Sequence, residues 1–335
     1  MPTPSRPNPS REIHLVRRPE GALQPDDFAL VTADVADPAD GEVLVRNLVM
    51  SVDPALRPRM SVGQELGEAI MGGALGRVEK SRNGAFKEGD LVSNRFGFRE
   101  VFVSDGKGLS PLKPEPGLPV EAYMNALGGP GFTAYGGLLR IGALKEGEQV
   151  FVSTAAGAVG AIASQIAKLK GCYVVGSTGS DEKVAWLKDE AGLDGAFNYK
   201  NGPVRQQLRP LVPKGIDVYF DNVGGEHLDA ALASMNLLGR VAVCGMISGY
   251  NEAGARTSVH NLSNIIYGRI TLRGFTAADF MDLRPQFLAD MAGWLRDGRI
   301  KTHETIYQGI EQAPAAMIDL MKGVNLGKML VRLAE

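Results

Sequence analysis

Residues 148–183 of this 335-residue chain have the sequence EQVFVSTAAGAVGAIASQIAKLKGCYVVGSTGSDEK. An apolar run ends in the turn AAGAVG (155–160), an amphipathic segment follows at once, and a second apolar run comes after it. The turn is a GxGxxG pattern with Ala155 in place of the first glycine. Gly157 would let the backbone approach a pyrophosphate, and Gly160 would let helix and strand pack closely, with helix N–H groups facing the phosphates. The stretch predicts a dinucleotide-binding unit; the alternative is that the glycines only make a tight strand–helix turn.

The residues after the second apolar run indicate which dinucleotide is bound. An NAD site of this type carries Asp or Glu about 20 residues after the turn, where it holds the ribose 2′-hydroxyl. Here residues 177–180 are Ser-Thr-Gly-Ser, so no carboxylate would repel a 2′-phosphate, and Lys183 just beyond could neutralise one. Lys183 could instead be a solvated surface lysine, with the neighbouring Asp181 and Glu182 serving as helix caps. We expect NADPH in preference to NADH.

After about residue 125, apolar runs alternate with amphipathic segments. Strands covered on both faces should be almost continuously apolar, and VFVSTA, YVVG and VAVCG fit this pattern. We expect strands at residues 148–155, 172–178, 195–199, 216–222, 239–245 and 270–275, and helices at 159–170, 181–191, 226–235 and 284–297. Six such strands with crossover helices make a doubly wound parallel sheet of the α/β class, the Rossmann arrangement.

The two flanking parts of the chain are β-rich instead. Residues 13–103 contain short apolar runs broken by Gly and Pro, and a Pro-rich connector follows at 111–119. The tail, with ETIYQGI and KMLVRLA, resembles this first part. We therefore expect a β-rich domain over residues 1–125 that residues 303–335 complete, and a dinucleotide-binding domain over residues 126–302.

Composition argues against several other function classes. Lys plus Arg number 36 against 38 Asp plus Glu, a net charge of −2, which gives no reason to expect nucleic acid or an anionic membrane as a partner. The two cysteines, Cys172 and Cys244, exclude a disulfide framework and are too few for the usual zinc site, and the four histidines show no metal-binding spacing. No apolar run approaches the ~18 residues that cross a bilayer. We expect a soluble, cytoplasmic protein that binds no metal.

Several further motifs, in order along the chain, resemble those of one family. They are PGFTAYGGLL (130–139), IAKLKGCYVVGSTGSDEK (166–183), YFDNVGGE (219–226), VAVCGMISGYN (241–251) and KGVNLGKMLVRL (322–333). Together they resemble the zinc-independent branch of the medium-chain dehydrogenase/reductase superfamily, which comprises prostaglandin, alkenal double-bond and curcumin reductases. The resemblance implies a GroES-like β-rich domain, NADPH as coenzyme and reduction of the C=C bond of α,β-unsaturated aldehydes and ketones. It also implies a homodimer that pairs through the edge of the dinucleotide sheet.

The resemblance further implies which residues contact the coenzyme. Ala158, Val159 and Gly160 would hold the pyrophosphate, and Lys183 and Tyr199 would reach the phosphate on the adenosine ribose. The other contacts would be Thr133, Asn222, Cys244, Gly245, Met246, Ile247, Ser248, Gly249, Tyr250, Phe275, Thr276, Ala277 and Asn325. Tyr199 and Phe275 could instead be core aromatics, and Cys244 would matter through its backbone more than its thiol.

An alkene reductase of this kind works without a metal. Hydride from NADPH would go to the β-carbon, and a hydrogen-bond donor would stabilise the enolate charge on the carbonyl oxygen. Our candidate donor is Tyr267, which stands eight residues before Phe275, as a tyrosine does in the family. Tyr267 could instead only line the substrate pocket or serve the fold, with the coenzyme's ribose hydroxyl polarising the carbonyl and water supplying the proton.

Two departures from the family pattern fall where the substrate is expected to bind. Family members commonly have VDPYMR where this chain has VDPALR, and GMPG where it has GGPG, so that Ala55 replaces Tyr and Gly129 replaces Met. With Tyr267, these positions make up the expected pocket, which would accept bulkier enones unless neighbouring side chains refill the space. The alternatives to an enone reductase are a quinone reductase of the same superfamily and a catalytically idle NADPH-binding protein.

Overall fold

The computed structural model describes residues 8–251 and 258–334, which form two compact units. The first unit comprises the chain up to residue 116, residues 304–325 and residues from 329 onward, and the second comprises residues 117–303 with 326–328. The first boundary therefore lies at residue 116, and the expected boundary at residue 125 is displaced. The reason is packing, because Ala122, Ala126 and Leu127 are buried in an apolar core of the second unit.

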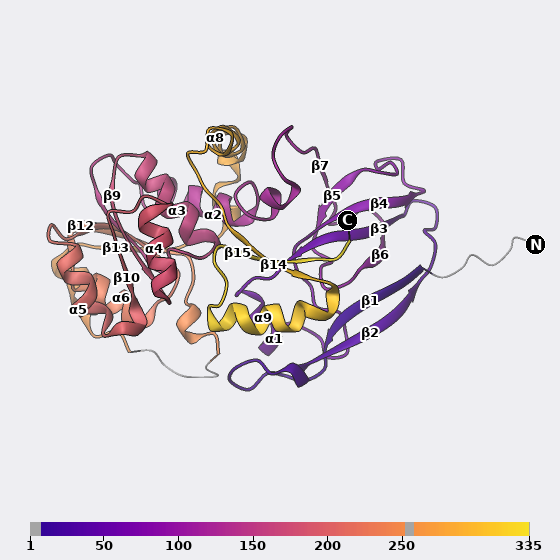
Figure 1. Ribbon diagram of the computed structural model, residues 1–335, viewed down its shortest axis with the longest axis horizontal. Helices are drawn as coiled ribbons and strands as arrows, with labels where there is room; N and C mark the ends of the chain where they lie inside the picture. The colour runs from indigo at the N-terminus through magenta and orange to yellow at the C-terminus, as the bar shows by residue number, and fades with distance from the viewer. Residues whose placement is uncertain (1–7, 252–257, 335) are drawn as a thin grey trace, which may run out of the picture. The chain divides into compact units, whose positions relative to one another are not determined.

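A six-stranded parallel sheet forms the centre of the second unit (Figure 1). In spatial order its strands are β10 (Gly195–Asn198), β9 (Tyr173–Thr178), β8 (Gln149–Val152), β11 (Ile216–Asp221), β12 (Met235–Val243) and β13 (Thr271–Gly274). This is the 3-2-1-4-5-6 order of a Rossmann sheet, so the predicted fold class and all six predicted strands are confirmed. The order reverses between β8 and β11, and the carboxyl ends of these two strands border the usual ligand crevice.

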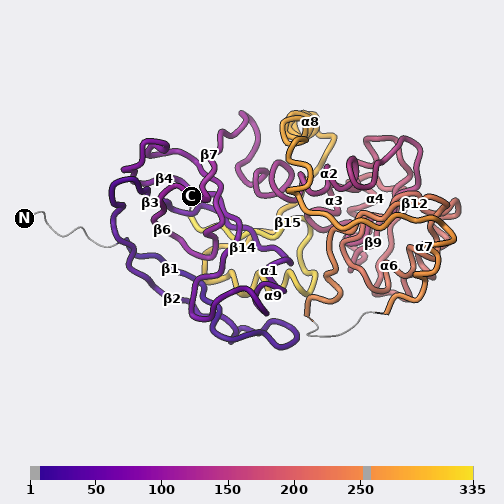
Figure 2. Tube along the Cα trace, turned by 180° about the vertical axis from the view of Figure 1, so that it is seen from behind, coloured from indigo at the N-terminus to yellow at the C-terminus, as the bar shows by residue number. Residues whose placement is uncertain are grey.

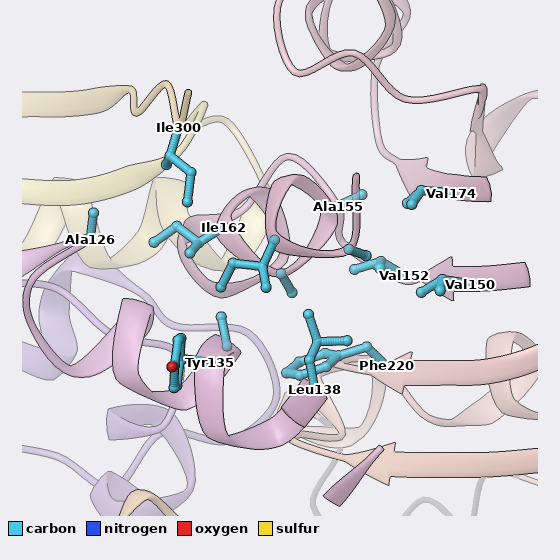
Figure 3. Close-up of a cluster of buried hydrophobic side chains, with 14 of the residues drawn as sticks. Ala126, Tyr135, Leu138, Val150, Val152, Ala155, Ile162, Val174, Phe220 and Ile300 are labelled. Carbon is cyan, nitrogen blue, oxygen red and sulfur yellow. The ribbon is translucent and has the colours of Figure 1, made fainter. Parts of the chain in front are cut away.

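Apolar side chains fill both faces of this sheet. Successive residues of a strand point to opposite faces, and in β8 Val150 and Val152 pack in one core while Phe151 packs in the other. Figure 3 shows the first core, where the Leu138 side chain lies beside Phe220 of β11. The described helices of the unit are α2 (Gly129–Gly136), α3 (Ala158–Leu169), α4 (Asp181–Asp189), α5 (Val204–Leu208), α6 (Gly225–Leu232), α7 (Asn264–Tyr267) and α8 (Arg284–Arg296).

The first unit is GroES-like and β-rich, as expected. Its larger sheet has the order β14 (Glu304–Gln308), β15 (Lys328–Arg332), β3 (Val43–Ser51), β4 (Ala74–Ser81), β5 (Leu91–Asn94) and β7 (Ser110–Leu112), with β6 (Val101–Ser104) also paired to β3. β15 pairs antiparallel with β3, so the tail does return to the β-rich unit. β1 (Asn8–Leu15) and β2 (Phe28–Val35) form a separate antiparallel hairpin, and its two strands lie side by side along their whole length (Figure 2).

Two helices complete the first unit. They are α1 (Leu56–Val62) and α9 (Ala313–Lys322), and buried side chains of both share one core with residues of β1 and β3. Within the described residues, no helix of either unit is both long and apolar enough to cross a membrane.

Candidate coenzyme and active site

The turn between β8 and α3 has the shape that a dinucleotide phosphate requires. Gly157 is the N-cap of α3 in extended conformation, and the preceding Thr154 has a positive φ of 51°. A Cβ on Gly160 would lie closer than 3.0 Å to the carbonyl oxygen of Thr154, a backbone atom that cannot move aside. Only glycine therefore lets the first turn of α3 approach the strand this closely, and the residues present fit a bound dinucleotide.

A backbone contact from the tail supports the same turn. The N–H of Gly327 donates to the carbonyl oxygen of Ala156 at 2.8 Å, and Gly157 and Gly327 form an isolated parallel bridge. Gly327 has a positive φ of 66°, and a Cβ there would collide with the backbone of His303. Residues 326–328 thus belong to the second unit, because Gly327 is bonded to this turn and Lys328 donates its N–H to the carbonyl oxygen of His303.

A buried polar cluster lies at the point where the strand order reverses. Ser153 follows β8 and the fully buried Asp221 ends β11. The hydroxyl of Tyr219 donates to Asp221 Oδ1 at 2.7 Å, and the N–H groups of Val223 and Gly224 donate to the same oxygen at 2.9 and 2.8 Å. Burial raises the pKa of Asp221 even though these backbone N–H groups favour its charged form.

The Asp221 carboxylate therefore holds the turn that follows β11 in one conformation. The amide of Asn222 donates to the carbonyl oxygen of Ser153 at 2.7 Å, which joins this turn to the end of β8. The sequence reasoning assigned Asn222 but missed Asp221. The signal that could have found it is a carboxylate at the end of an otherwise apolar strand, where burial requires hydrogen-bond partners.

The predicted loop after β12 is fixed to the same turn. Cys244 and Gly245 donate their N–H groups to the carbonyl oxygen of Asp221 at 2.8 and 3.1 Å, and the Ser248 hydroxyl donates to the carbonyl of Val223 at 2.6 Å. The structure thus brings the predicted residues 244–250 together with Asn222 at the carboxyl edge of the sheet. Burial raises the pKa of Cys244 to about 12, so its thiol stays protonated at neutral pH and is no nucleophile.

The expected 2′-phosphate end of the site lies at the carboxyl ends of β9 and β10. Ser180 is the N-cap of α4 and its hydroxyl accepts a hydrogen bond from the N–H of Lys183. Lys183 is only 9% exposed, so it is not the solvated surface lysine of the alternative interpretation. Burial lowers its pKa and the nearby Lys200 lowers it further. The hydroxyl of Tyr199 lies against Gly179, where a Cβ would be 3.1 Å away from it.

The predicted residues after β13 differ in how far they are buried. The half-buried Phe275 ring packs edge-on against Phe220 at 6.0 Å and also contacts Phe280, so part of this ring lies against the core. Thr276 begins a short 3-10 helix over Ala277–Leu283 and forms a capping box with Asp279. Thr133 is half-buried in α2.

Tyr267 is not brought to the carboxyl edge of its own sheet. It ends α7 before β13 begins, and the adjacent Gly268 accepts a hydrogen bond from Leu238, near the start of β12. At a rise of about 3.3 Å per residue, the two ends of β13 are on the order of 10 Å apart. Tyr267 is 81% exposed at the amino end, whereas Phe275 follows the carboxyl end. Within one chain Tyr267 therefore lies apart from the residues that follow β13, and its role as hydrogen-bond donor stays a prediction.

The remaining predicted residues fall in different units. Gly129 begins α2 in the second unit and is exposed, and a Cβ there would meet nothing within 4 Å. Ala55 is the exposed N-cap of α1 in the first unit, and Asn325 follows α9 in the same unit and is buried.

Comparison with known proteins gives two family models and several full-length relatives. The models are described as "N-terminal domain of oxidoreductase" over residues 11–112 and "Zinc-binding dehydrogenase" over residues 158–292. Despite the second description, the described residues contain no group of three or more His, Cys, Asp or Glu side chains that could hold a metal ion.

Three similar proteins cover nearly the whole chain. Prostaglandin reductase 1 of Rattus norvegicus is 43% identical over 93% of this chain and 96% of its own length. The NADP(+)-dependent 2-alkenal reductase of Nicotiana tabacum is 41% identical over 88% of each. The crystal structure of CurA from Vibrio vulnificus in complex with NADPH has a TM-score of 0.91 and 38% identity, over 97% of this chain and 99% of that one.

Proposed function

Because this chain belongs to the zinc-independent medium-chain dehydrogenase/reductase family of prostaglandin, 2-alkenal and curcumin reductases and is an NADP-dependent oxidoreductase, we propose that it reduces the C=C bond of α,β-unsaturated aldehydes and ketones. The observation that carries the proposal is the carboxyl edge of the Rossmann sheet. Three features meet there: a glycine turn shaped for phosphates, a buried lysine shortly after the strand end where NAD enzymes have a carboxylate, and a hydrogen-bonded loop after β12. A cytoplasmic location stays a prediction.

The proposed reaction assigns a role to each part of this edge. NADPH, when bound, supplies the hydride for the β-carbon of the acceptor, and a proton from water then adds to the α-carbon of the enolate. Residues 157–160 would hold the pyrophosphate, and Lys183 would bind the 2′-phosphate as a charge-assisted donor. Asn222 and residues 244–250, fixed by Asp221, would orient the nicotinamide half so that the two reactants meet in one geometry. The residues after β13 would frame the acceptor side.

The reaction also needs a donor for the enolate oxygen, and we propose that a homodimer supplies it. β13 is the last strand of the sheet, and no strand in the described part of the chain pairs with its outer side. The segments flanking this edge expose large apolar side chains, namely Leu237, Leu238, Leu262, Ile266 and Tyr267. A two-fold axis through the middle of β13 would pair the strand with its own copy in antiparallel orientation.

In an antiparallel pair, Tyr267 of each subunit would lie close to the site of the other subunit. The residues that precede β13 in one copy would then run beside the residues that follow β13 in the other. Tyr267 of the partner subunit would therefore lie next to residues 275–278, at the edge where the nicotinamide is expected. On this proposal the phenol donates to the carbonyl oxygen of an acceptor bound by the other chain, and each site needs both subunits.

The Tyr267→Phe variant tests this role. We expect kcat to fall by about 10²–10³, the usual effect of removing one oxyanion donor. The oligomeric state, measured by sedimentation, and the Kd for NADPH should stay unchanged. Tyr173→Phe, a half-buried tyrosine of β9 outside the proposed site, is the matched control and should keep full activity. A Tyr267→Phe enzyme with nearly normal kcat would leave the donor role without support.

The reaction itself is tested by following NADPH oxidation with a panel of acceptors. We expect turnover with a short 2-alkenal and a higher kcat/KM, by about tenfold, with a bulky aryl enone, because Ala55 and Gly129 lack the family's larger side chains. Gly129→Met should reverse this preference. Turnover restricted to a quinone would identify the chain as a quinone reductase, and no turnover with any acceptor would indicate an idle NADPH-binding protein.

A further inference from the structure

The geometry points to His227 as a positioning residue that makes the coenzyme site selective for a 2′-phosphate. It acts through Tyr199 and does not itself touch the ligand. His227 is the third residue of α6, directly after the glycine turn that ends β11, and it is 5% exposed. This inference rests on the NADP coenzyme and not on the proposed reaction, so it can be tested without any acceptor.

The contact with Tyr199 is the first part of the argument. The centroids of the two rings lie 5.3 Å apart, and the ring planes form an angle of 78°. This is an edge-to-face contact, in which the edge of one ring packs against the face of the other. Tyr199 keeps 38% of its surface exposed, so part of this side chain remains open to a ligand. His227, which is buried, contacts the same side chain.

The Tyr199 hydroxyl is held at the place that decides coenzyme choice. It lies against Gly179, one residue after the end of β9, where NAD enzymes of this fold carry their acidic residue. Lys183, on the first turn of α4, comes four residues later. A tyrosine fixed here can donate a charge-assisted hydrogen bond to a 2′-phosphate beside the lysine, whereas NADH presents only a neutral 2′-hydroxyl, which is a weaker acceptor.

The buried Nε2 of His227 indicates that the ring itself, and not a hydrogen bond from this nitrogen, is the useful feature. Nε2 is buried and has no hydrogen-bond partner in the described structure. Desolvation lowers the pKa of His227 to about 4, so the ring is neutral at pH 7 and brings no charge to the phosphate. We therefore infer that His227 acts through its shape: its flat ring occupies the space between the phenol of Tyr199 and α6, and so prevents the phenol from moving toward α6.

The test measures binding to the full-length protein by calorimetry, with NADPH, NADH and 2′,5′-ADP as ligands. For His227→Leu we expect the Kd of NADPH and of 2′,5′-ADP to rise about tenfold, and the Kd of NADH to change less than twofold. His227→Phe keeps a flat ring in the same place and should restore all three values to within about twofold. Thermal unfolding confirms that each variant is folded, and His227→Met replaces His227→Leu if the latter does not fold.

The outcomes separate the roles. Loss of 2′-phosphate selectivity in His227→Leu with recovery in His227→Phe supports the inference. An equal loss of NADPH and NADH binding would show a purely structural role and overturn it, as would an unchanged NADPH-to-NADH ratio. Failure of His227→Phe to recover would overturn it too, because the nitrogen and not the ring would then be required. None of these results depends on which acceptor the enzyme reduces.

Discussion

The Gly160→Ala variant is expected to lose at least about 100-fold in NADPH affinity and about 3 kcal/mol in the free energy of unfolding. The added Cβ would lie closer than 3.0 Å to the carbonyl oxygen of Thr154 and would also meet the backbone of Ala155. Since neither atom belongs to a side chain, the clash can be relieved only if the turn opens and α3 moves away from β8. Fluorescence titration with NADPH and urea unfolding measure the two effects.

Gly293→Ala is the matched control for this substitution. Gly293 lies inside α8, and a Cβ there would meet nothing within 4 Å. Replacing a helical glycine by alanine in open space should stabilise the protein by about 0.5–1 kcal/mol and leave NADPH binding unchanged. If Gly160→Ala instead bound NADPH like the unmodified protein with the same unfolding midpoint, the turn would not be the phosphate site.

The Lys183→Glu variant is expected to raise the KM for NADPH about 100-fold and the KM for NADH less than threefold. The substitution replaces a charge-assisted donor to the 2′-phosphate by a carboxylate that repels it, whereas NADH has no phosphate at this position. Steady-state kinetics with both coenzymes give the ratio. Lys183→Met, which is uncharged and of similar length, guards against misfolding caused by a buried carboxylate and should shift the ratio in the same direction by a smaller factor.

Lys188→Glu, an exposed position on the same helix, gives the same change of net charge and should leave both KM values unchanged. An equal effect of Lys183→Glu on NADPH and NADH would refute the assigned role. Because burial and Lys200 lower the pKa of Lys183, its charge is lost at a lower pH than for an ordinary lysine. NADPH affinity in the unmodified protein should therefore fall as the pH rises through that lowered pKa, and NADH affinity should not follow.

The sequence by itself determined the architecture of the second unit. Continuous apolar runs predicted β8 to β13, because side chains on both faces of such strands are buried and are therefore mostly apolar. The glycine spacing at residues 157–160 predicted the phosphate turn. Backbone approach at Gly157 and close helix–strand packing at Gly160 both depend only on atoms a few residues apart in the sequence. The absence of a carboxylate at residues 177–180 indicated NADP, in agreement with the relatives.

The tertiary structure decided the features that depend on which distant segments meet. The predicted strand at residues 270–275 already separated Tyr267 from Phe275, but only the structure shows that Tyr267 is 81% exposed and that β13 is the edge strand of its sheet. The burial of Lys183, the hydrogen bonds that Asp221 accepts and the ring contact of His227 with Tyr199 likewise join separate strands and helices. Local patterns specify elements, but contacts between elements arise only when the parallel sheet places their ends at one edge.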